Sequence, residues 1–421
     1  MPPLTPRRNV GTARSFGGAL VVTALALVGC TGGDEDVAPS TSLADASTTT
    51  TTIERPNDGV LKIGLFLPRT GEGAQLGEPM IGAITDAVDL INQAGGVFGS
   101  DVEIEIVDSG AGTGPDPLLS SGVDAIIGPA SSRLALTHLA SMTQPSTGVV
   151  TCSPTATAIA LDDFPDNGFF FRTVPSDTLQ MAAIARKVQD TGIESVAVGY
   201  LDDPYGRGLV DRFADAARAR GLEIQTQVGF GGEQDDLSEI VAELVAGSPG
   251  VIVVLGDADD GSRLLAALDG ATPPELRRVV VHDAIRDARA TIQALSANFV
   301  QLLVGVAPAA RSQSPDGPPG FFTAHAADCA NLIALAAVVA GSDSPARIKS
   351  KIGEVASGGR VCTSYAGCVG LLDQDLQIDY KGASGSVDLS NSAGDPVRAW
   401  FETFSFDTNG AETDSQLFEI P

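Results

Sequence analysis

The chain has 421 residues, of which 43% are hydrophobic, 19% charged and 5% aromatic. That composition is typical of a globular protein, and the length suffices for two to three domains. The 53 acidic residues outnumber the 26 basic ones and give a formal net charge of -27. A surface of this sign repels phosphate, which argues against nucleic acid or anionic lipid as a partner; it also keeps an exported protein soluble.

The first thirty residues have the architecture of an export signal. An arginine-containing segment precedes the short apolar stretch 17–28, and Gly29 and Cys30 follow. The run LVGC resembles a bacterial lipobox, which predicts a signal peptide over 1–29 and a lipid on the Cys30 thiol. The alternative is an ordinary signal peptide with an accidental cysteine. The Arg7-Arg8 pair leaves the general secretory and twin-arginine routes both open.

Residues 30–58 form a predicted flexible tether. The segment includes an unbroken threonine run at 48–52 and has little apolar content. It cannot bury enough surface to offset the entropy of ordering. A lipid followed by a tether predicts that the rest of the chain lies outside the cytoplasmic membrane, anchored to its outer face.

From residue 60 the chain alternates short apolar strands with helical segments. Strands are expected at 61–66, 102–107, 125–127 and 149–150, and then at 195–200, 223–228, 251–255, 279–281 and 302–306. Pro79 is expected to open a helix that ends at Gly95-Gly96, and the apolar stretch 330–340 is too short to span a bilayer. Repeated βα units predict an α/β fold of two doubly wound parallel-sheet lobes, with ligands bound beyond the carboxyl ends of the strands.

The sequence offers little support for a nucleotide site or an enzyme. The third glycine of the first loop, Gly77, falls one place too late for a dinucleotide motif, although Asp108 ends the next strand. Only three histidines occur, and the HExxH, CxxC and GxSxG patterns are absent. His282-Asp283 is the nearest approach to a catalytic pair, but adjacent strand residues point to opposite faces. No metal or cofactor is expected.

Two hydroxyl-rich loops follow neighbouring strands. Residues 128–132 read GPASS and residues 153–157 read SPTAT. Hydroxyls and backbone amides at a helix N-terminus can hold a carboxylate. Each loop alone could serve simply as a helix cap. Because both loops lie at the same edge of the expected sheet, together they favour a binding site.

The loops of the second series carry an aromatic residue and several acids. Tyr205 follows the first strand of that series, and Asp257, Asp259 and Asp260 follow the strand 251–255. Asp283 follows the strand 279–281. The tyrosine could close over a ligand, and a carboxylate could bind an ammonium group. Capping of the following helices is the alternative for each acid.

Four cysteines remain after Cys30. Cys362 and Cys368 flank a short turn and are expected to pair, which leaves Cys152 and Cys329 as the second pair. Four cysteines allow three pairings, so the second assignment stays open.

These motifs together resemble the type I periplasmic binding proteins that serve branched-chain-amino-acid ABC importers, from about residue 60 to the C-terminus. The resemblance is carried by IGLFLPRTGEGAQLGEPMIGA, DAIIGPASS, SPTAT, FFRTVPSD, DDPYGRG and IDYKGASGSVDLSNSAGDP, in that order. It implies two lobes joined by a three-segment hinge near residues 172–175, 306–308 and 382–385. The lobes would then comprise 59–174 with 307–383 and 175–306 with 384–421.

The resemblance also implies a ligand site. The ligand carboxylate would be held at Ala130, Ser131, Ser132, Ser153 and Thr155. Tyr205 matches the ligand-stacking tyrosine of the family, and Asp283 matches its ammonium-binding acid, with Asp257 nearby.

The implied function is that of a monomeric solute-binding lipoprotein, which passes an amino acid or a similar molecule to an ABC permease and its ATPase. A sensor lipoprotein without transport, or an exported enzyme, is the alternative. The segment 108–123 is short for the family, Leu76 stands where some members carry an aromatic residue, and Arg133 follows the serine pair. Cationic, polyhydroxylated, amide, urea and aromatic ligands therefore stay open.

Overall fold

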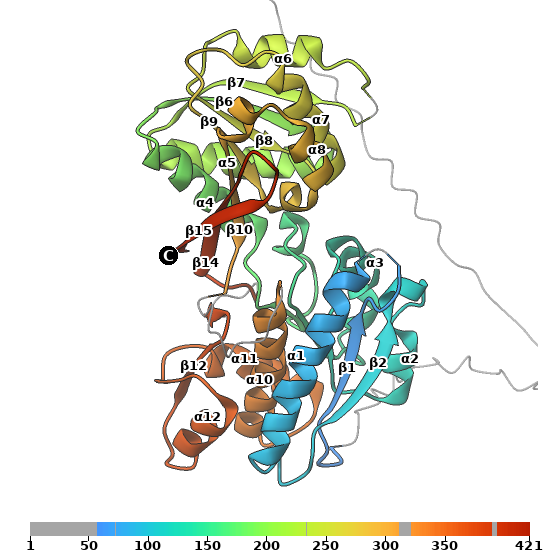
Figure 1. Ribbon diagram of the computed structural model, residues 1–421. Coiled ribbons are helices and arrows are strands. Elements are labelled where there is room, and N and C mark those ends of the chain that lie inside the picture. The colour runs from blue at the N-terminus through green and yellow to red at the C-terminus, as the bar shows by residue number, and fades with distance from the viewer. Residues whose placement is uncertain (1–56, 72, 233, 311–320, 390–393) are drawn as a thin grey trace, which may run out of the picture. The chain divides into compact units, whose positions relative to one another are not determined.

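The computed structural model describes residues 57–421 except 72, 233, 311–320 and 390–393. The expected signal peptide, Cys30 and most of the tether lie outside the described residues. The remaining chain forms two α/β lobes, each with helices on both faces of a central sheet (Figure 1). The expected α/β fold with parallel sheets in two lobes is confirmed.

The first lobe is built on a five-stranded sheet in which all strands are parallel. The strand order is β2-β1-β3-β4-β5. The strands are β1 (Lys62–Leu67), β2 (Glu103–Asp108), β3 (Ala125–Ile127), β4 (Val150–Ser153) and β5 (Phe170–Arg172). Their carboxyl ends therefore share one edge, which positions the loops that follow β3 and β4 side by side.

Helices cover both faces of this sheet. Ile63 and Leu65 of β1 pack on one side, whereas Phe66 packs on the other. The first side is covered by α1 (Ala74–Gln93), α10 (Thr323–Ala340), α11 (Pro345–Val355) and α12 (Tyr365–Leu372). The other side is covered by α2 (Asp116–Ser121) and α3 (Ser132–Met142), with the short turn η2 (Ile159–Leu161). A further short turn, η1 (Ser109–Ala111), follows β2. A small sheet of β11 (Arg360–Cys362), β12 (Ile378–Gly382) and β13 (Gly385–Ser386) completes the lobe.

The second lobe has a seven-stranded mixed sheet in the order β15-β14-β10-β9-β8-β6-β7. Its parallel strands are β6 (Ser195–Leu201), β7 (Glu223–Phe230), β8 (Val251–Leu255), β9 (Arg278–His282) and β10 (Leu303–Pro308). The antiparallel strands β14 (Ala399–Phe406) and β15 (Glu412–Ile420) extend it at one edge. These two C-terminal strands were not expected from the sequence.

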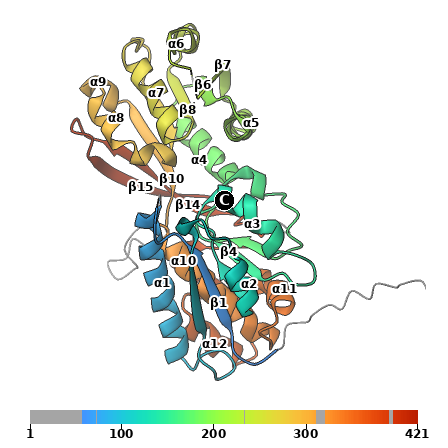
Figure 2. The same cartoon turned by 90° about the vertical axis from the view of Figure 1, so that its right-hand side faces the viewer.

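The helices of the second lobe also divide between two faces (Figure 2). One face is covered by α4 (Asp177–Asp190) and α5 (Pro204–Ala219). The other is covered by α6 (Ser238–Val245), α7 (Ala258–Asp269), η3 (Asp283–Asp287), α8 (Arg289–Ala294) and α9 (Ala297–Val300).

Two helices differ from the sequence prediction. Helix α1 begins at Ala74 and contains Pro79, which was expected to open it. The glycine-rich loop supplies its first turn, where Gly77 lies so close to the Pro68 carbonyl that a Cβ would be 1.6 Å from the oxygen. Helix α10 begins at Thr323, so it is longer than expected and apolar enough to span a membrane, but 78% of it is buried inside the protein. It is a core helix, as expected.

The chain passes between the sheets three times. The first passage lies between β5 and α4, and the second follows β10. Gly382 and Gly385, expected in the third passage, instead pair within the hairpin β12–β13. Val387 and Leu389 still pack in the first lobe, and β14 begins at Ala399. The third passage is therefore later than expected, because the hairpin prolongs the first lobe; the lobe boundaries drawn from the sequence remain predictions.

Both expected disulfides are present. Cys362 pairs with Cys368, and Cys152 pairs with Cys329 across a sequence separation of 177 residues. The second bond joins the end of β4 to α10, so it fixes the strand that precedes the second hydroxyl-rich loop.

Candidate functional site

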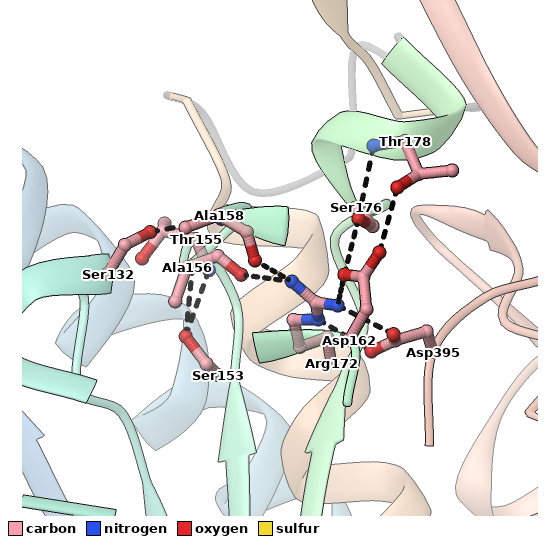
Figure 3. A network of polar contacts seen from close by, with 10 residues as sticks. All are labelled: Ser132, Ser153, Thr155, Ala156, Ala158, Asp162, Arg172, Ser176, Thr178 and Asp395. Atoms are coloured by element: carbon pink, nitrogen blue, oxygen red, sulfur yellow. Dashed lines mark hydrogen bonds and ion pairs between the residues drawn. The ribbon is translucent and has the colours of Figure 1, made fainter. Parts of the chain in front are cut away.

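The two hydroxyl-rich loops of the first lobe are bonded to each other. Thr155 Oγ1 donates to the Ala130 carbonyl at 2.6 Å, and Ser132 Oγ accepts from the Ala158 amide at 3.2 Å. Ser153 is fully buried, and its Oγ donates to the Pro129 carbonyl at 2.7 Å. The loops after β3 and β4 therefore form one rigid unit, part of which is drawn in Figure 3.

Some of these residues hold the loops in place, and others remain accessible to a ligand. Ser153 also accepts from the Ala156 amide at 3.0 Å, so its hydroxyl is used within the loop. Ser131 caps α3 by accepting from the Leu134 amide at 3.4 Å, and it remains partly exposed together with Thr155. The amides in the first turn of a helix have no partner inside the helix. The start of α3 can thus offer amides and hydroxyls to an anion, with Ser153 as support.

An acid that the sequence reasoning passed over lies beside these loops. Asp177 is the first residue of α4, is 1% exposed, and its amide donates to the Thr157 carbonyl at 2.8 Å. Its Oδ2 atom is buried without a hydrogen-bond partner among the described residues. Burial, followed by the negative charge of Asp283, raises the pKa of Asp177 to about 7. A buried carboxylate with an unused oxygen is suited to a cationic ligand group.

The sequence contained one signal for Asp177. It stands in the FRTVPSD segment, where an expected strand crosses into an expected helix. An acid in the first turn of a helix is common, because it favours the positive end of the helix dipole, so the pattern alone did not separate it from a cap. The burial of Asp177 distinguishes it from a simple helix cap, and this burial is known only from the fold.

Asp283 lies near Asp177 and already has partners. Its Oδ1 accepts from Gln180 Nε2 at 2.6 Å and lies 3.5 Å from His282 Nδ1. Burial acts to raise the pKa of Asp283, but the hydrogen bond and charge of His282 outweigh it and leave the pKa below its usual value. Asp283 is therefore an anion that is held in place. His282 is buried, with Nε2 at 2.5 Å from the Gly256 carbonyl, so it acts as a support.

Tyr205 belongs to the same group of residues. It is in the first turn of α5, which Asp203 caps by accepting from the Gly206 amide at 2.7 Å. Tyr205 is partly buried against the apolar cluster that α4 and α5 form with the second sheet. Burial, and then the charges of Asp177 and Asp283, raise the pKa of Tyr205 well above its usual value. The phenol therefore stays protonated and can donate a hydrogen bond.

Asp257 has a local role in this structure. It is exposed and caps α7 by accepting from the Asp260 amide at 2.8 Å. Asp260 pairs with Arg263 at 2.8 Å, so two of the three acids after β8 have partners within their own helix. The capping alternative describes Asp257 in the ligand-free chain.

The described residues thus bring together a hydroxyl and amide group on one side and a pair of acids with a tyrosine on the other. A molecule carrying both a carboxylate and an ammonium matches this arrangement. Within residues 57–421, outside the gaps already given, no group of three His, Cys, Asp or Glu side chains is placed to hold a metal ion.

The sequence is similar to those of known binding proteins. A family model described as periplasmic binding protein matches residues 60–272. The chemotactic signal transduction system substrate-binding protein BasB of Halobacterium salinarum is 27% identical over 363 residues, which is 80% of this chain and 85% of that protein. The Leu/Ile/Val-binding protein BraC3 of Rhizobium johnstonii is 30% identical over 38% of this chain and 45% of its own length.

Solved structures share the fold. An ABC transporter substrate-binding protein of Desulfitobacterium hafniense in complex with Leu has a TM-score of 0.65 and 21% identity, over 85% of this chain and all of that one. The branched-chain amino acid substrate-binding protein LivJ of Streptococcus pneumoniae in complex with isoleucine has a TM-score of 0.62 and 19% identity, over 86% of this chain and all of that one.

Proposed function

The chain belongs to the periplasmic binding protein family, in its type I branched-chain amino acid group, and we propose that it captures an L-amino acid outside the cytoplasmic membrane and delivers it to an ABC importer. The observation that carries this proposal is Asp177 Oδ2, which is buried and has no hydrogen-bond partner among the described residues. The amide of the same residue donates to the Thr157 carbonyl, in the loop that presents Thr155. An ammonium group could donate the hydrogen bond that would satisfy this oxygen.

In the proposed complex the amino acid spans both groups of residues. Its carboxylate accepts from the first-turn amides of α3 and from the hydroxyl of Ser131. The Thr155 hydroxyl can donate to it only after leaving the Ala130 carbonyl, and Ser132, Ser153 and the Ala130 backbone hold these loops in place. Its ammonium donates to Asp177 and to Asp283. Tyr205 covers the ligand from the start of α5. Asp257 would contact a polar side chain of the ligand.

Binding would close the two lobes about the three connecting segments. Closure removes water from between the charged groups, and this strengthens each of their contacts. The ligand stabilises the closed form because only that form offers both sets of contacts at once.

The family implies an extracytoplasmic location, and the chain is proposed to be held there by a lipid on Cys30. The permease and ATPase of an importer would then be its partners, and the chain would act as a monomer without a cofactor. A labelled-lipid incorporation assay on the full-length chain and on C30S tests the anchor, since only the natural chain should carry the label.

Sensing is a second candidate role, since BasB, which this chain resembles over most of its length, is described as part of a chemotactic signal transduction system. Uptake of the bound amino acid should fall when the gene is deleted if the role is import. An unchanged uptake with a lost behavioural or transcriptional response would favour sensing.

A ligand screen tests the binding function itself. The folded domain is to be heated with each of the twenty L-amino acids, and with amides, polyamines and aromatic acids, since a ligand held only by the folded form raises the melting temperature. Calorimetric titration should then compare the affinity of the natural chain for each stabilising ligand with the affinities of S131A, T155A and D283N. An absence of binding in the whole panel, or unchanged affinity in all three variants, would refute the site. Turnover of the ligand would instead indicate an enzyme.

A further inference from the structure

A fully buried arginine lies behind the proposed site and touches none of its ligand-binding atoms. Arg172 ends β5, immediately before the first passage between lobes, and is 0% exposed. Its Nε and Nη2 donate to the two oxygens of Asp395 at 2.6 Å each. The same Nη2 donates to Asp162 Oδ1 at 2.6 Å (Figure 3).

The remaining donors of Arg172 bind the second hydroxyl-rich loop. Nη1 donates to the carbonyls of Ala156 at 3.3 Å and Ala158 at 3.1 Å. A guanidinium has five N–H donors in a fixed planar geometry, and here all five are used. The loop that presents Thr155 is therefore fastened to a rigid group by its own backbone.

Asp162 connects the same guanidinium to the start of α4. Its Oδ1 also accepts from Ser176 Oγ at 2.7 Å, and its Oδ2 accepts from Thr178 Oγ1 at 2.8 Å. The two hydroxyls flank Asp177 in the sequence, so the residue proposed to bind the ammonium is held on both sides. Figure 3 shows Asp162 between Arg172 and these hydroxyls.

We propose that Arg172 and Asp162 are positioning residues that fix the spacing between the carboxylate-binding loop and Asp177. This inference rests on the proposed function. The fixed spacing selects ligands whose carboxylate and ammonium are joined through a single carbon. Arg172 is fully buried and the Asp162 side chain is 18% exposed, so water competes little for their ion pair, and a ligand with a different spacing cannot be accommodated by a small shift of α4. Neither residue contacts the ligand. The selection acts through the distance between the two subsites.

Two variants test this inference with a matched control. D162N keeps the shape of the side chain but loses the ion pair, and R172K keeps the positive charge but loses the planar fork. D343N is the control: Asp343 is a first-lobe acid, 1% exposed, whose Oδ2 accepts from the Gly59 amide at 2.7 Å, before β1 and so at the opposite edge of the sheet from both loops. All three are to be confirmed as cooperatively folding before comparison.

The first readout needs no ligand. The Asp177 amide, bonded to the Thr157 carbonyl, should exchange its hydrogen at least tenfold faster in D162N and R172K than in the natural chain, whereas its rate in D343N should stay within twofold of the natural rate. An unchanged exchange rate in both test variants would overturn the inference, whatever the ligand.

The second readout is selectivity between L-leucine and β-leucine, in which the amino group is one carbon further from the carboxylate. D162N should weaken L-leucine binding tenfold or more and reduce the preference over β-leucine, whereas D343N should change neither. Faster exchange with an unchanged preference would reduce the pair to a purely structural role and contradict the inference. Failure of the natural chain to bind either compound would count against the proposed function. The exchange measurement would still decide whether Arg172 and Asp162 hold the start of α4 in place.

Discussion

Replacing Asp177 by asparagine should change ligand binding and stability in opposite directions. In the ligand-free protein the pKa of Asp177 is raised from 3.8 to about 7, mainly by burial. A raised acid pKa means that the folded state holds the proton more tightly than the unfolded chain. The ionised side chain therefore costs nothing below pH 4, an increasing amount between pH 4 and 7, and the full amount above pH 7.

The magnitude of that cost follows from the shift. A shift of about three pKa units corresponds to about 4 kcal/mol at pH 8, at 1.36 kcal/mol per unit. Asparagine has the shape of the protonated acid and carries no charge, so D177N should gain a few kcal/mol of unfolding free energy at pH 8, with about 4 as the upper bound. The gain should vanish toward pH 4. Urea unfolding of the ligand-free protein at both pH values measures it.

The same substitution removes the proposed partner of the ligand ammonium. Truncating one member of a buried charge pair costs about 2 kcal/mol or more, and the amide oxygen retains part of the contact, so affinity should fall about 30- to 150-fold at pH 8. D407N, at an exposed turn carboxylate, is the control and should leave affinity unchanged. Binding by D177N at natural affinity, or a loss of stability at pH 8, would refute the reasoning.

Two further predictions concern pH and the disulfides. Because the Asp177 carboxyl must be ionised to accept the ammonium, ligand affinity should fall about tenfold per pH unit below pH 7. Calorimetry at pH 6 in two buffers should report proton release on binding. An affinity that does not change between pH 5.5 and 8 would contradict this prediction. Removing the Cys152–Cys329 bond by double alanine substitution should cost about 5 kcal/mol of unfolding free energy by loop-closure entropy, against about 2 kcal/mol for Cys362–Cys368, and an equal cost in urea unfolding would argue against that ordering.

The sequence predicted much of the fold because burial of parallel strands leaves a direct pattern. Runs such as VIVVL at 251–255 and AII at 125–127 are apolar throughout and became central strands. The start of α1 was missed because glycine is a poor helix former and proline is typical of the first turn of a helix, whereas packing of Gly77 against the Pro68 backbone extends the helix. The C-terminal hairpin β14–β15 was missed because its pairing joins the sheet only through a distant strand.

Part of the candidate site could be predicted from the sequence, for a physical reason. Hydroxyls after β3 and β4 could be placed at one edge because parallel strands share their carboxyl ends, and Asp283 was found by the same rule. Asp177 was missed because it follows a passage between lobes and not a strand of the second sheet. Its burial depends on contacts with Thr157 that are set by tertiary structure. The division of the serines into support and contact likewise required the bond from Ser153 to Pro129.

The decisive experiment is a crystal structure of the chain with the L-amino acid that gives the largest thermal shift. We expect the ligand nitrogen to lie within about 3 Å of Asp177 Oδ2, at ordinary hydrogen-bond distance, with the ligand carboxylate at the start of α3 beside Ser131 and Thr155. A ligand bound elsewhere, or bound with its carboxylate beside Asp177, would contradict it.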